Sequence, residues 1–384
     1  ITAKLIQADG FQVGATEKAD RELKNIFALH DEVAGLIAKN LSLKLGAGSA
    51  AATAAVNPEA FELYVQARQA FHRTTQEGHE RTKELLTRAL ALEPNFARAR
   101  AALSDVLRNL AQAAATAGGF SQRTGPAMSE IMSEAQRAVA LDGDLPEARV
   151  ALGAAFWMAW RFDEARRELG RAIALNANLA SAHHLLARVQ LSDGRIDEAL
   201  LAYERAVILD PLFSRLADNY SAALYCAGRL KECIAEADRA LVLQPQNWQA
   251  MGHRMVALAR LGRTAEAIAE AKDGRGLFVG DVAYVQMLGG ERAAAEQQLA
   301  GRPHTFREAR ALAALGRFDD CITAIQSGAM VAHGVEFLLF DRVFDPIRED
   351  PRFRKILDEC GVTEAHARAQ AWRKAHPPEK QAAR

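Results

Sequence analysis

A 34-residue period runs through the middle of the chain, between Pro146 and Pro245. Within it, one alanine and one glycine recur at this spacing, and each copy reads as two amphipathic helices joined by a short turn. The recurring residues are Ala172, Ala206 and Ala240, and Gly194, Gly228 and Gly262. Such a repeat buries its apolar faces only by stacking against its neighbours. The period therefore predicts an α-solenoid, in which helix pairs stack along one direction.

Each position of the repeat carries the residue size that two packed helices require. Small residues stand where helix backbones approach each other, and larger ones stand where neighbouring repeats meet. The small residues are Gly153, Ala187, Ser221, Ala165, Ala199 and Ala206, and the larger ones are Leu152, Phe156, Leu169, Leu186, Tyr203 and Tyr220. A glycine after the first helix can adopt the left-handed cap conformation, and Pro211 or Pro245 cannot continue the second helix. Together these features resemble the tetratricopeptide repeat (TPR), which implies a mainly α, right-handed solenoid of helix pairs.

Weaker copies of the repeat extend the array on both sides of this central stretch. We expect the solenoid to span residues 58–328, with about seven to eight helix pairs. The spacing from Ala89 to Ala138 exceeds one period, which predicts an insertion at residues 116–126. An insertion in a solenoid maps to a loop on one of its faces.

The period is lost beyond residue 328. Residues 344–361 contain Asp-Pro twice, followed by an amphipathic stretch with Phe353, Ile356 and Leu357. This stretch resembles the closing segment of bacterial TPR arrays, and we expect residues 329–375 to form a helical cap over the last apolar face. The polar residues 376–384 at the chain end are expected to be disordered.

Residues 1–45 show the patterns of strands and of one long helix, and not the pattern of the repeat. The alternation in residues 1–16 predicts two short strands around a turn at Asp9-Gly10, and residues 21–45 predict one long amphipathic helix. Two short strands and one helix are marginal as a domain, so we expect the end of an α/β domain. The small, uncharged residues 46–57 predict a flexible linker.

The stretch ITAKLIQADG, followed by ADRELKNIFALHDEVAGLIAKNL, resembles the end of the TolB-like α/β module. In many bacterial signalling proteins this module precedes a TPR array. The resemblance implies an upstream class III adenylate or guanylate cyclase domain, or an upstream winged-helix DNA-binding domain. Two roles therefore stay open for the array, the regulation of a cyclase and the regulation of transcription. Self-association through the N-terminal segment is a further alternative.

The composition limits which kinds of partner the chain is expected to bind. Lys and Arg together number 48, as do Asp and Glu, so no basic excess indicates nucleic-acid binding. No apolar run approaches the ~20 residues that span a membrane, and the chain starts at Ile1 without Met or a signal region. The four cysteines show no metal-ligand spacing and are expected to be buried thiols. We expect a cytoplasmic piece of a longer protein, without cofactor or metal.

We find no constellation of residues that would catalyse a reaction. Phosphate-binding loops and hydrolase motifs are absent from the sequence. Paired acids recur just before the small residue of the second helix, where they cap N–H groups and favour the helix dipole. These acids are Asp163 and Glu164, Asp197 and Glu198, and Asp319 and Asp320. The chain is therefore predicted to be a non-catalytic scaffold.

The first helix of each TPR pair lines the concave side, where an extended peptide or a partner helix can lie. Aromatic and Arg residues are the usual hot-spot types on such surfaces. The candidate protein-binding residues are Trp157, Met158, His184, Arg188, Leu191, Arg215, Asp218, Tyr225 and Arg260. We expect a protein or peptide partner in this groove, and neither nucleic acid nor a membrane bound by this chain.

Overall fold

The computed structural model describes residues 2–3, 17–18, 56–71, 75–118, 125–273, 278–302, 304–327 and 334–377. The chain divides into two units, residues 1–56 and residues 57–384. In the first unit, strand β1 (Thr2–Ala3) pairs antiparallel with strand β2 (Glu17–Lys18). The second strand thus lies just beyond residues 1–16, whose alternating pattern predicts the two strands. The predicted helix at 21–45 and the linker up to residue 55 lie outside the described residues.

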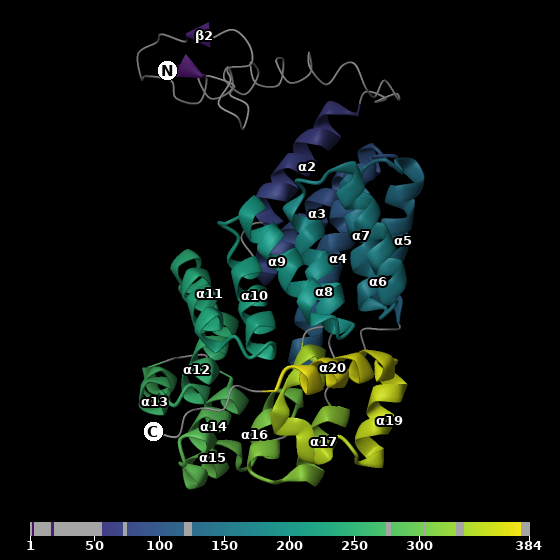
Figure 1. Cartoon of the computed structure of the whole chain (residues 1–384). Coiled ribbons are helices and arrows are strands. Elements are labelled where there is room, and N and C mark those ends of the chain that lie inside the picture. Colours follow the sequence, from purple (N-terminus) through teal and green to yellow (C-terminus); the bar gives the residue numbers. More distant parts are fainter. Residues whose placement is uncertain are drawn as a thin grey trace. The chain divides into compact units, whose positions relative to one another are not determined.

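The second unit begins with helix pairs that follow one another along the chain (Figure 1). The pairs are α2 (Pro58–Phe71) with α3 (Gln76–Leu92), α4 (Ala97–Gly118) with α5 (Pro126–Leu141), α6 (Pro146–Met158) with α7 (Phe162–Leu175), α8 (Ala180–Ser192) with α9 (Ile196–Leu209), α10 (Ser214–Cys226) with α11 (Leu230–Leu243), α12 (Trp248–Arg260) with α13 (Thr264–Asp273), α14 (Val279–Leu288) with α15 (Arg292–Leu299), and α16 (Ala309–Ala314), after the 3-10 turn η1 (Phe306–Glu308), with α17 (Phe318–Ser327). Each first helix contacts the next first helix, as α4 contacts α6 and α6 contacts α8. This arrangement confirms the predicted α-solenoid of TPR helix pairs.

In the third to eighth pairs, the turn depends on a residue in the left-handed conformation. Gly194, Gly228 and Gly262 have φ angles of 76°, 75° and 81°, as their place after the first helix predicts. Trp160 holds the same place in the third pair with φ 61°, alone among the described residues other than glycine. Its ring is buried beside Phe162, so packing offsets the conformational cost.

The core runs along the array between its two layers of helices. Ala165, Ala199 and Ala206 have no exposed surface, and a Cβ at Gly153 would lie 2.7 Å from Leu169 Cγ. Leu169 and Tyr203 are themselves almost fully buried. The small positions of the repeat therefore mark close approaches of helices, as predicted.

Part of the extra length in the second pair lengthens a helix. Helix α4 has 22 residues, whereas α6 and α8 have 13 each. The helix extends into the predicted insertion as far as Gly118, and α5 begins at Pro126. Residues 119–124 of the predicted loop lie outside the described residues.

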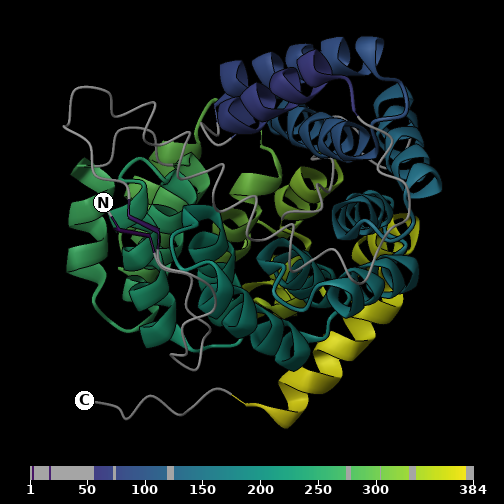
Figure 2. The same cartoon turned by 90° about the horizontal axis from the view of Figure 1, so that it is seen from above.

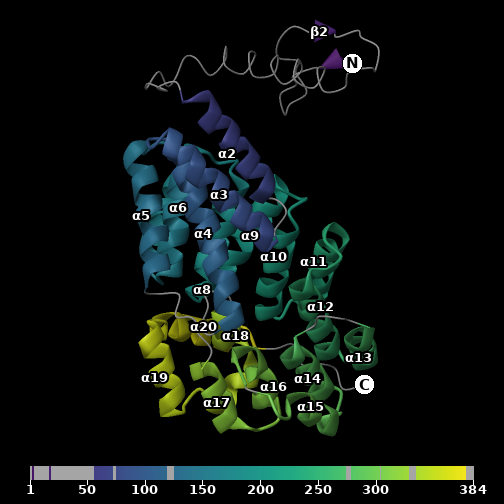
Figure 3. The same ribbon diagram turned by 180° about the vertical axis from the view of Figure 1, so that it is seen from behind.

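Four short elements follow the last pair, and we call residues 334–377 the C-terminal segment. They are α18 (Val335–Phe340), the 3-10 helix η2 (Arg342–Ile347), α19 (Pro351–Cys360) and α20 (Thr363–Ala375). Helix α19 contacts α17 and buries Phe353, Ile356 and Leu357. Helix α18 contacts α8 and α10, and α20 lies beside α8 in opposite views (Figures 1 and 3). The C-terminal segment therefore returns to the middle of the array.

The helix pairs follow a curve when they are seen from above, in colours from purple through teal to green (Figure 2). The curvature brings α4 and α10 together, since Arg215 Nη1 donates to Asn109 Oδ1 at 3.5 Å. These residues belong to the second and fifth pairs. We therefore call the surface formed by α4, α6, α8, α10 and α12 the inner surface. In the part of the chain that the structure describes, no helix is long and apolar enough to cross a membrane.

Candidate functional site

All nine candidate binding residues lie on first helices of the array. Trp157 and Met158 are on α6, while the other seven are on α8, α10 and α12. Seven of the nine are less than a tenth exposed, and only Arg215 and Arg260 have an intermediate exposure. All nine residues thus share one layer of helices, but most of these side chains are covered.

Two of the candidates meet between α6 and α8, and a third, His184, contacts α10. The guanidinium of Arg188 lies 4.1 Å from the centroid of the Trp157 ring, and Trp157 Nε1 donates to Ser192 Oγ at 3.1 Å. His184 Nε2 lies 2.9 Å from Asn219 Nδ2. Burial lowers the pKa of His184, so its neutral ring accepts this hydrogen bond. The side chains surround a small cavity, which is lined by Trp157, Arg188, Leu191, Ser192, Tyr203, Asn219, Ala222 and Glu336.

A second group of polar side chains lies where α4 meets α10. Arg108 and Asn109 are 7% and 5% exposed, and Gln112 is 9% exposed. Among the described residues, the donors Arg108 Nε and Nη1, Asn109 Nδ2 and Gln112 Nε2 have no hydrogen-bond acceptor. Arg215 reaches Asn109 from α10. We call Arg108, Asn109, Gln112 and Arg215 the donor cluster.

Burial and the repulsion between like charges lower the pKa values of two arginines on the inner surface. Burial first, and then Arg108 and Arg215, lower the pKa of Arg188 to about 9, against the attraction of Tyr203. The pKa of Arg215 is also lowered, first by burial and then by Arg108. Burial and the like charge of Arg108 thus both disfavour the charged form of these two guanidinium groups.

Tyr225 and Arg260 contact the chain's own C-terminal segment. The Tyr225 hydroxyl donates to Asp341 Oδ2 at 2.7 Å, and it accepts from Arg260 Nη1 at 3.2 Å. Arg260 Nη1 also lies 3.6 Å from Asp341 Oδ1. The ring of Phe337 meets Tyr225 edge to face, with 5.9 Å between centroids. This part of the inner surface is therefore occupied by α18.

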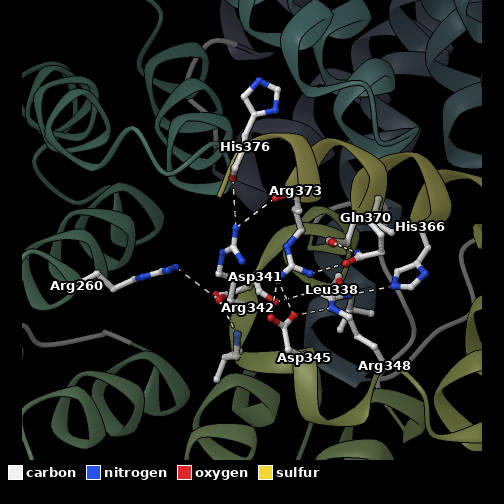
Figure 4. A network of polar contacts seen from close by, with 12 residues as sticks. Arg260, Leu338, Asp341, Arg342, Asp345, Arg348, His366, Gln370, Arg373 and His376 are labelled. Carbon is white, nitrogen blue, oxygen red and sulfur yellow. Dashed lines mark hydrogen bonds and ion pairs between the residues drawn. The ribbon is translucent and has the colours of Figure 1, made fainter. Parts of the chain in front are cut away.

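A polar network holds the C-terminal segment in its shape (Figure 4). Arg348 donates to the backbone oxygens of Leu338 and Asp341, at 2.8 Å each, and to His366 Nε2 at 3.0 Å. Asp345 accepts from Arg348 Nε at 2.8 Å and from Arg373 Nη2. Burial lowers the pKa of Arg348 to about 10. The network ties α18, η2 and α20 into one body.

The far end of the C-terminal segment is attached to the turn between α8 and α9. The Asp193 carboxylate is 3% exposed and pairs with Arg166, Arg195 and Arg368. Arg368 Nε also donates to the Asp193 backbone oxygen at 2.8 Å, and Trp372 Nε1 donates to Asp197 Oδ2 at 2.9 Å.

This attachment was not predicted from the sequence. Two signals point in its direction. Residues 337–340 form an unbroken apolar run, and Ala365 and Ala369 stand one helical turn apart on α20. Neither signal indicates which part of the array the C-terminal segment contacts.

The described residues contain no group of three or more His, Cys, Asp or Glu side chains that could hold a metal ion. Burial raises the pKa of Cys233 and of Cys321 to about 12, so these thiols stay protonated at neutral pH. The paired acids occupy the first turns of α7, α9 and α17. This location fits the predicted effect on the helix dipole. The carboxylates themselves pair with arginines, as Glu164 does with Arg161 and Asp320 with Arg317, and the N-cap residues of α7 and α9 form no side-chain cap.

Comparison with protein-family models gives no match. A Rhizobium meliloti protein named "Putative adenylate cyclase 3" is 32% identical over 155 residues, which cover 39% of this chain and 25% of that protein. The match thus spans about a quarter of that relative's length.

The chain is also similar to solved structures. TTC0263, a thermophilic TPR protein of Thermus thermophilus, is 17% identical, with 52% of this chain and 98% of that one covered and a TM-score of 0.42. The Pseudomonas aeruginosa pilF protein is 17% identical, with 62% and 97% covered and a TM-score of 0.40. YrrB, described as a TPR protein with an unusual peptide-binding site, is 14% identical, with 55% and 96% covered and a TM-score of 0.35.

Proposed function

We propose that residues 57–377 are a non-catalytic TPR scaffold, which binds a protein or peptide partner on the inner surface. The observation that carries this proposal is the gathering of Trp157, Arg188 and Asn219 around one cavity, where Asn219 also bonds to His184. Aromatic rings and guanidinium groups supply most of the binding energy in protein interfaces.

The scaffold is proposed to serve a bacterial signalling protein in the cytoplasm. The 32% identity to part of a protein named as a cyclase supports a regulatory role next to a class III adenylate or guanylate cyclase domain. A winged-helix regulator of transcription is the second candidate, because the TolB-like resemblance applies to both. The two differ in a simple readout, since a longer version of the protein would either produce a cyclic nucleotide or bind DNA.

Photo-crosslinking tests the scaffold function. A photoreactive phenylalanine is placed at Asn219, which lines the cavity on α10, and in a matched variant at Val242, which is 82% exposed on α11. We expect covalent adducts with a partner protein in the native host from position 219 and none from position 242. Adducts from position 242 alone, or from neither position, would contradict the proposal.

A further inference from the structure

We propose that the C-terminal segment is an autoinhibitory strap, whose helix α18 occupies the inner surface until the partner displaces it. This inference rests on the scaffold function proposed above and adds how access to the scaffold is controlled. Glu336 of α18 is 9% exposed and lines the same cavity as Trp157, Arg188 and Asn219. A partner that enters this cavity therefore has to move α18.

Helix α18 makes the kind of contacts that a bound peptide makes. The centroid of its Phe337 ring lies 5.9 Å from that of Tyr225 and 5.8 Å from that of His253. The guanidinium of Arg310 lies 4.6 Å from the Phe337 centroid. The three surrounding residues come from α10, α12 and α16, and aromatic and arginine side chains of this kind are typical of protein interfaces. An aromatic side chain of the partner is therefore expected to replace Phe337.

The C-terminal segment satisfies backbone groups of α18 without the array. Arg348 Nη1 donates to the Leu338 backbone oxygen at 2.8 Å (Figure 4). Gln370 Nε2 donates to the Leu339 backbone oxygen at the same distance. Buried polar groups need partners, and these oxygens keep theirs when the segment leaves the inner surface. Helices α18 and α20 can thus move together as one body.

One end of the C-terminal segment is fixed to the last helix pair. The 3-10 helix η2 packs against α16 and α17, and α19 packs against α17. Phe344 of η2 and Phe353 of α19 are 1% and 0% exposed. Exposure of such large apolar side chains to water is unfavourable. This end therefore stays on the array when the other end moves.

The other end of the C-terminal segment is held by polar contacts. The Arg368 side chain is 33% exposed and pairs with Asp193, while Trp372 Nε1 donates to a carboxylate of α9. Asp193 also pairs with Arg166 and Arg195, so its charge stays compensated when Arg368 leaves. Water can replace polar contacts near the surface at a small cost. This end is therefore the one that opens.

Thiol labelling of the full chain tests the inference, with Ala222→Cys as a reporter in the cavity and mass spectrometry to identify the labelled residue. Ala222 is 6% exposed, so a maleimide should react slowly with the reporter while α18 is in place. The double variant Arg368→Ala/Trp372→Phe removes both polar contacts and keeps an aromatic ring on α20. We expect it to label at least ~10-fold faster, because the open form becomes more populated.

The matched control is Lys374→Ala, which removes a positive charge from an exposed position of α20 and should leave the labelling rate unchanged. Gly194→Ala is a second way to open the strap, since its added Cβ would lie 2.3 Å from the Ala365 oxygen. Gly228→Ala is the control for that variant, because an added Cβ there would meet nothing within 4 Å.

Photo-crosslinking from position 219 gives the functional readout, and the double variant should form more partner adduct than the wild type. Unchanged labelling in both the double variant and Gly194→Ala would overturn the inference, while adducts from the wild type would still support the scaffold. Faster labelling without a gain in adducts would make the segment a brace of the fold and would overturn its autoinhibitory role. Faster labelling without any adduct in either protein would overturn the scaffold function and the inference with it.

Discussion

At the scale of single residues, Tyr225 shows how one hydroxyl joins distant parts of the chain. It lies on α10, is 2% exposed, and bridges Arg260 of α12 and Asp341 of the C-terminal segment. The Asp341 side chain is 1% exposed. Loss of the bridge would leave this carboxylate short of a donor in a place that water does not reach.

Tyr225→Phe is therefore expected to lower the free energy of unfolding by about 1–3 kcal/mol, the cost of an unsatisfied buried acceptor. Tyr220→Phe is the control, because the Tyr220 hydroxyl donates at 3.3 Å to Glu204, whose side chain is 46% exposed. Water can replace that bond, and the expected loss is about 0.5 kcal/mol or less. Urea denaturation measures both, and equal losses would contradict the bridging role.

His366 links stability to pH. Burial first, and then Arg348, Arg373 and Arg354, lower its pKa to about 4, well below the ~6.5 of an unfolded histidine. Between these values the unfolded chain binds a proton that the folded chain does not. The free energy of unfolding should therefore fall as the pH falls from about 6.5 to about 4.

His366→Gln should weaken this pH dependence, because glutamine keeps an acceptor for Arg348 but does not titrate. Burial also lowers the pKa of His79 and of His184, so the informative quantity is the difference between the wild type and the variant. Unfolding midpoints at pH 7 and pH 4.5 give that difference. Parallel losses in the two proteins would show that His366 does not contribute.

At the scale of helices, the repeat depends on the distance between paired backbones. Gly153 lies in the middle of α6, where an added Cβ would be 2.7 Å from Leu169 Cγ and 3.3 Å from the Ala165 oxygen. Gly170 lies in the middle of α7, and an added Cβ there would meet nothing within 4 Å. The two glycines are therefore a matched pair for separating packing from helix propensity.

Gly153→Ala is expected to destabilise the chain by about 1–3 kcal/mol, through overpacking against α7. Gly170→Ala is expected to stabilise it by about 0.5–1 kcal/mol, because alanine has the better helix propensity. Chemical denaturation of both variants against the wild type measures these changes. The same sign for both substitutions would mean that the α6–α7 spacing can relax.

At the scale of the whole second unit, the turn between α8 and α9 serves two purposes. Gly194 closes the fourth helix pair, and an added Cβ there would lie 2.3 Å from the Ala365 oxygen and 3.2 Å from Ala369 N. Gly228 has nearly the same φ angle, and an added Cβ there would meet nothing within 4 Å. Of these two turns, only the one at Gly194 has to leave room for α20.

Gly194→Ala should therefore release α20, whereas Gly228→Ala should impose the same backbone strain without doing so. Hydrogen exchange of the amides in residues 363–375 measures the release. We expect faster exchange there in the Gly194 variant only. The amides of α2 and α3 should change their exchange rates less than those of α20. Unchanged exchange in α20 of the Gly194 variant would show that the attachment adapts to the extra methyl group.

The fold could be predicted from the sequence to the extent that it depends on near neighbours. Ala172, Ala206 and Ala240 lie at equal spacing because each packs against the helix just before it along the chain. The inner layer of helices could be selected for the same reason. The exposure of its side chains could not, since Tyr225 and Arg188 are covered by other parts of the chain.

The sequence by itself determined the helix pairs, their left-handed turns and the sizes of the residues between them, because these features depend on contacts within about one period. The tertiary structure decided that α4 meets α10, that α18 occupies part of the inner surface and that Arg368 reaches Asp193. Those contacts depend on the curvature that small rotations accumulate over several pairs. The spacing of residues within one period does not reveal this accumulated curvature. The donor cluster and the attached C-terminal segment could therefore be recognised only in the folded chain.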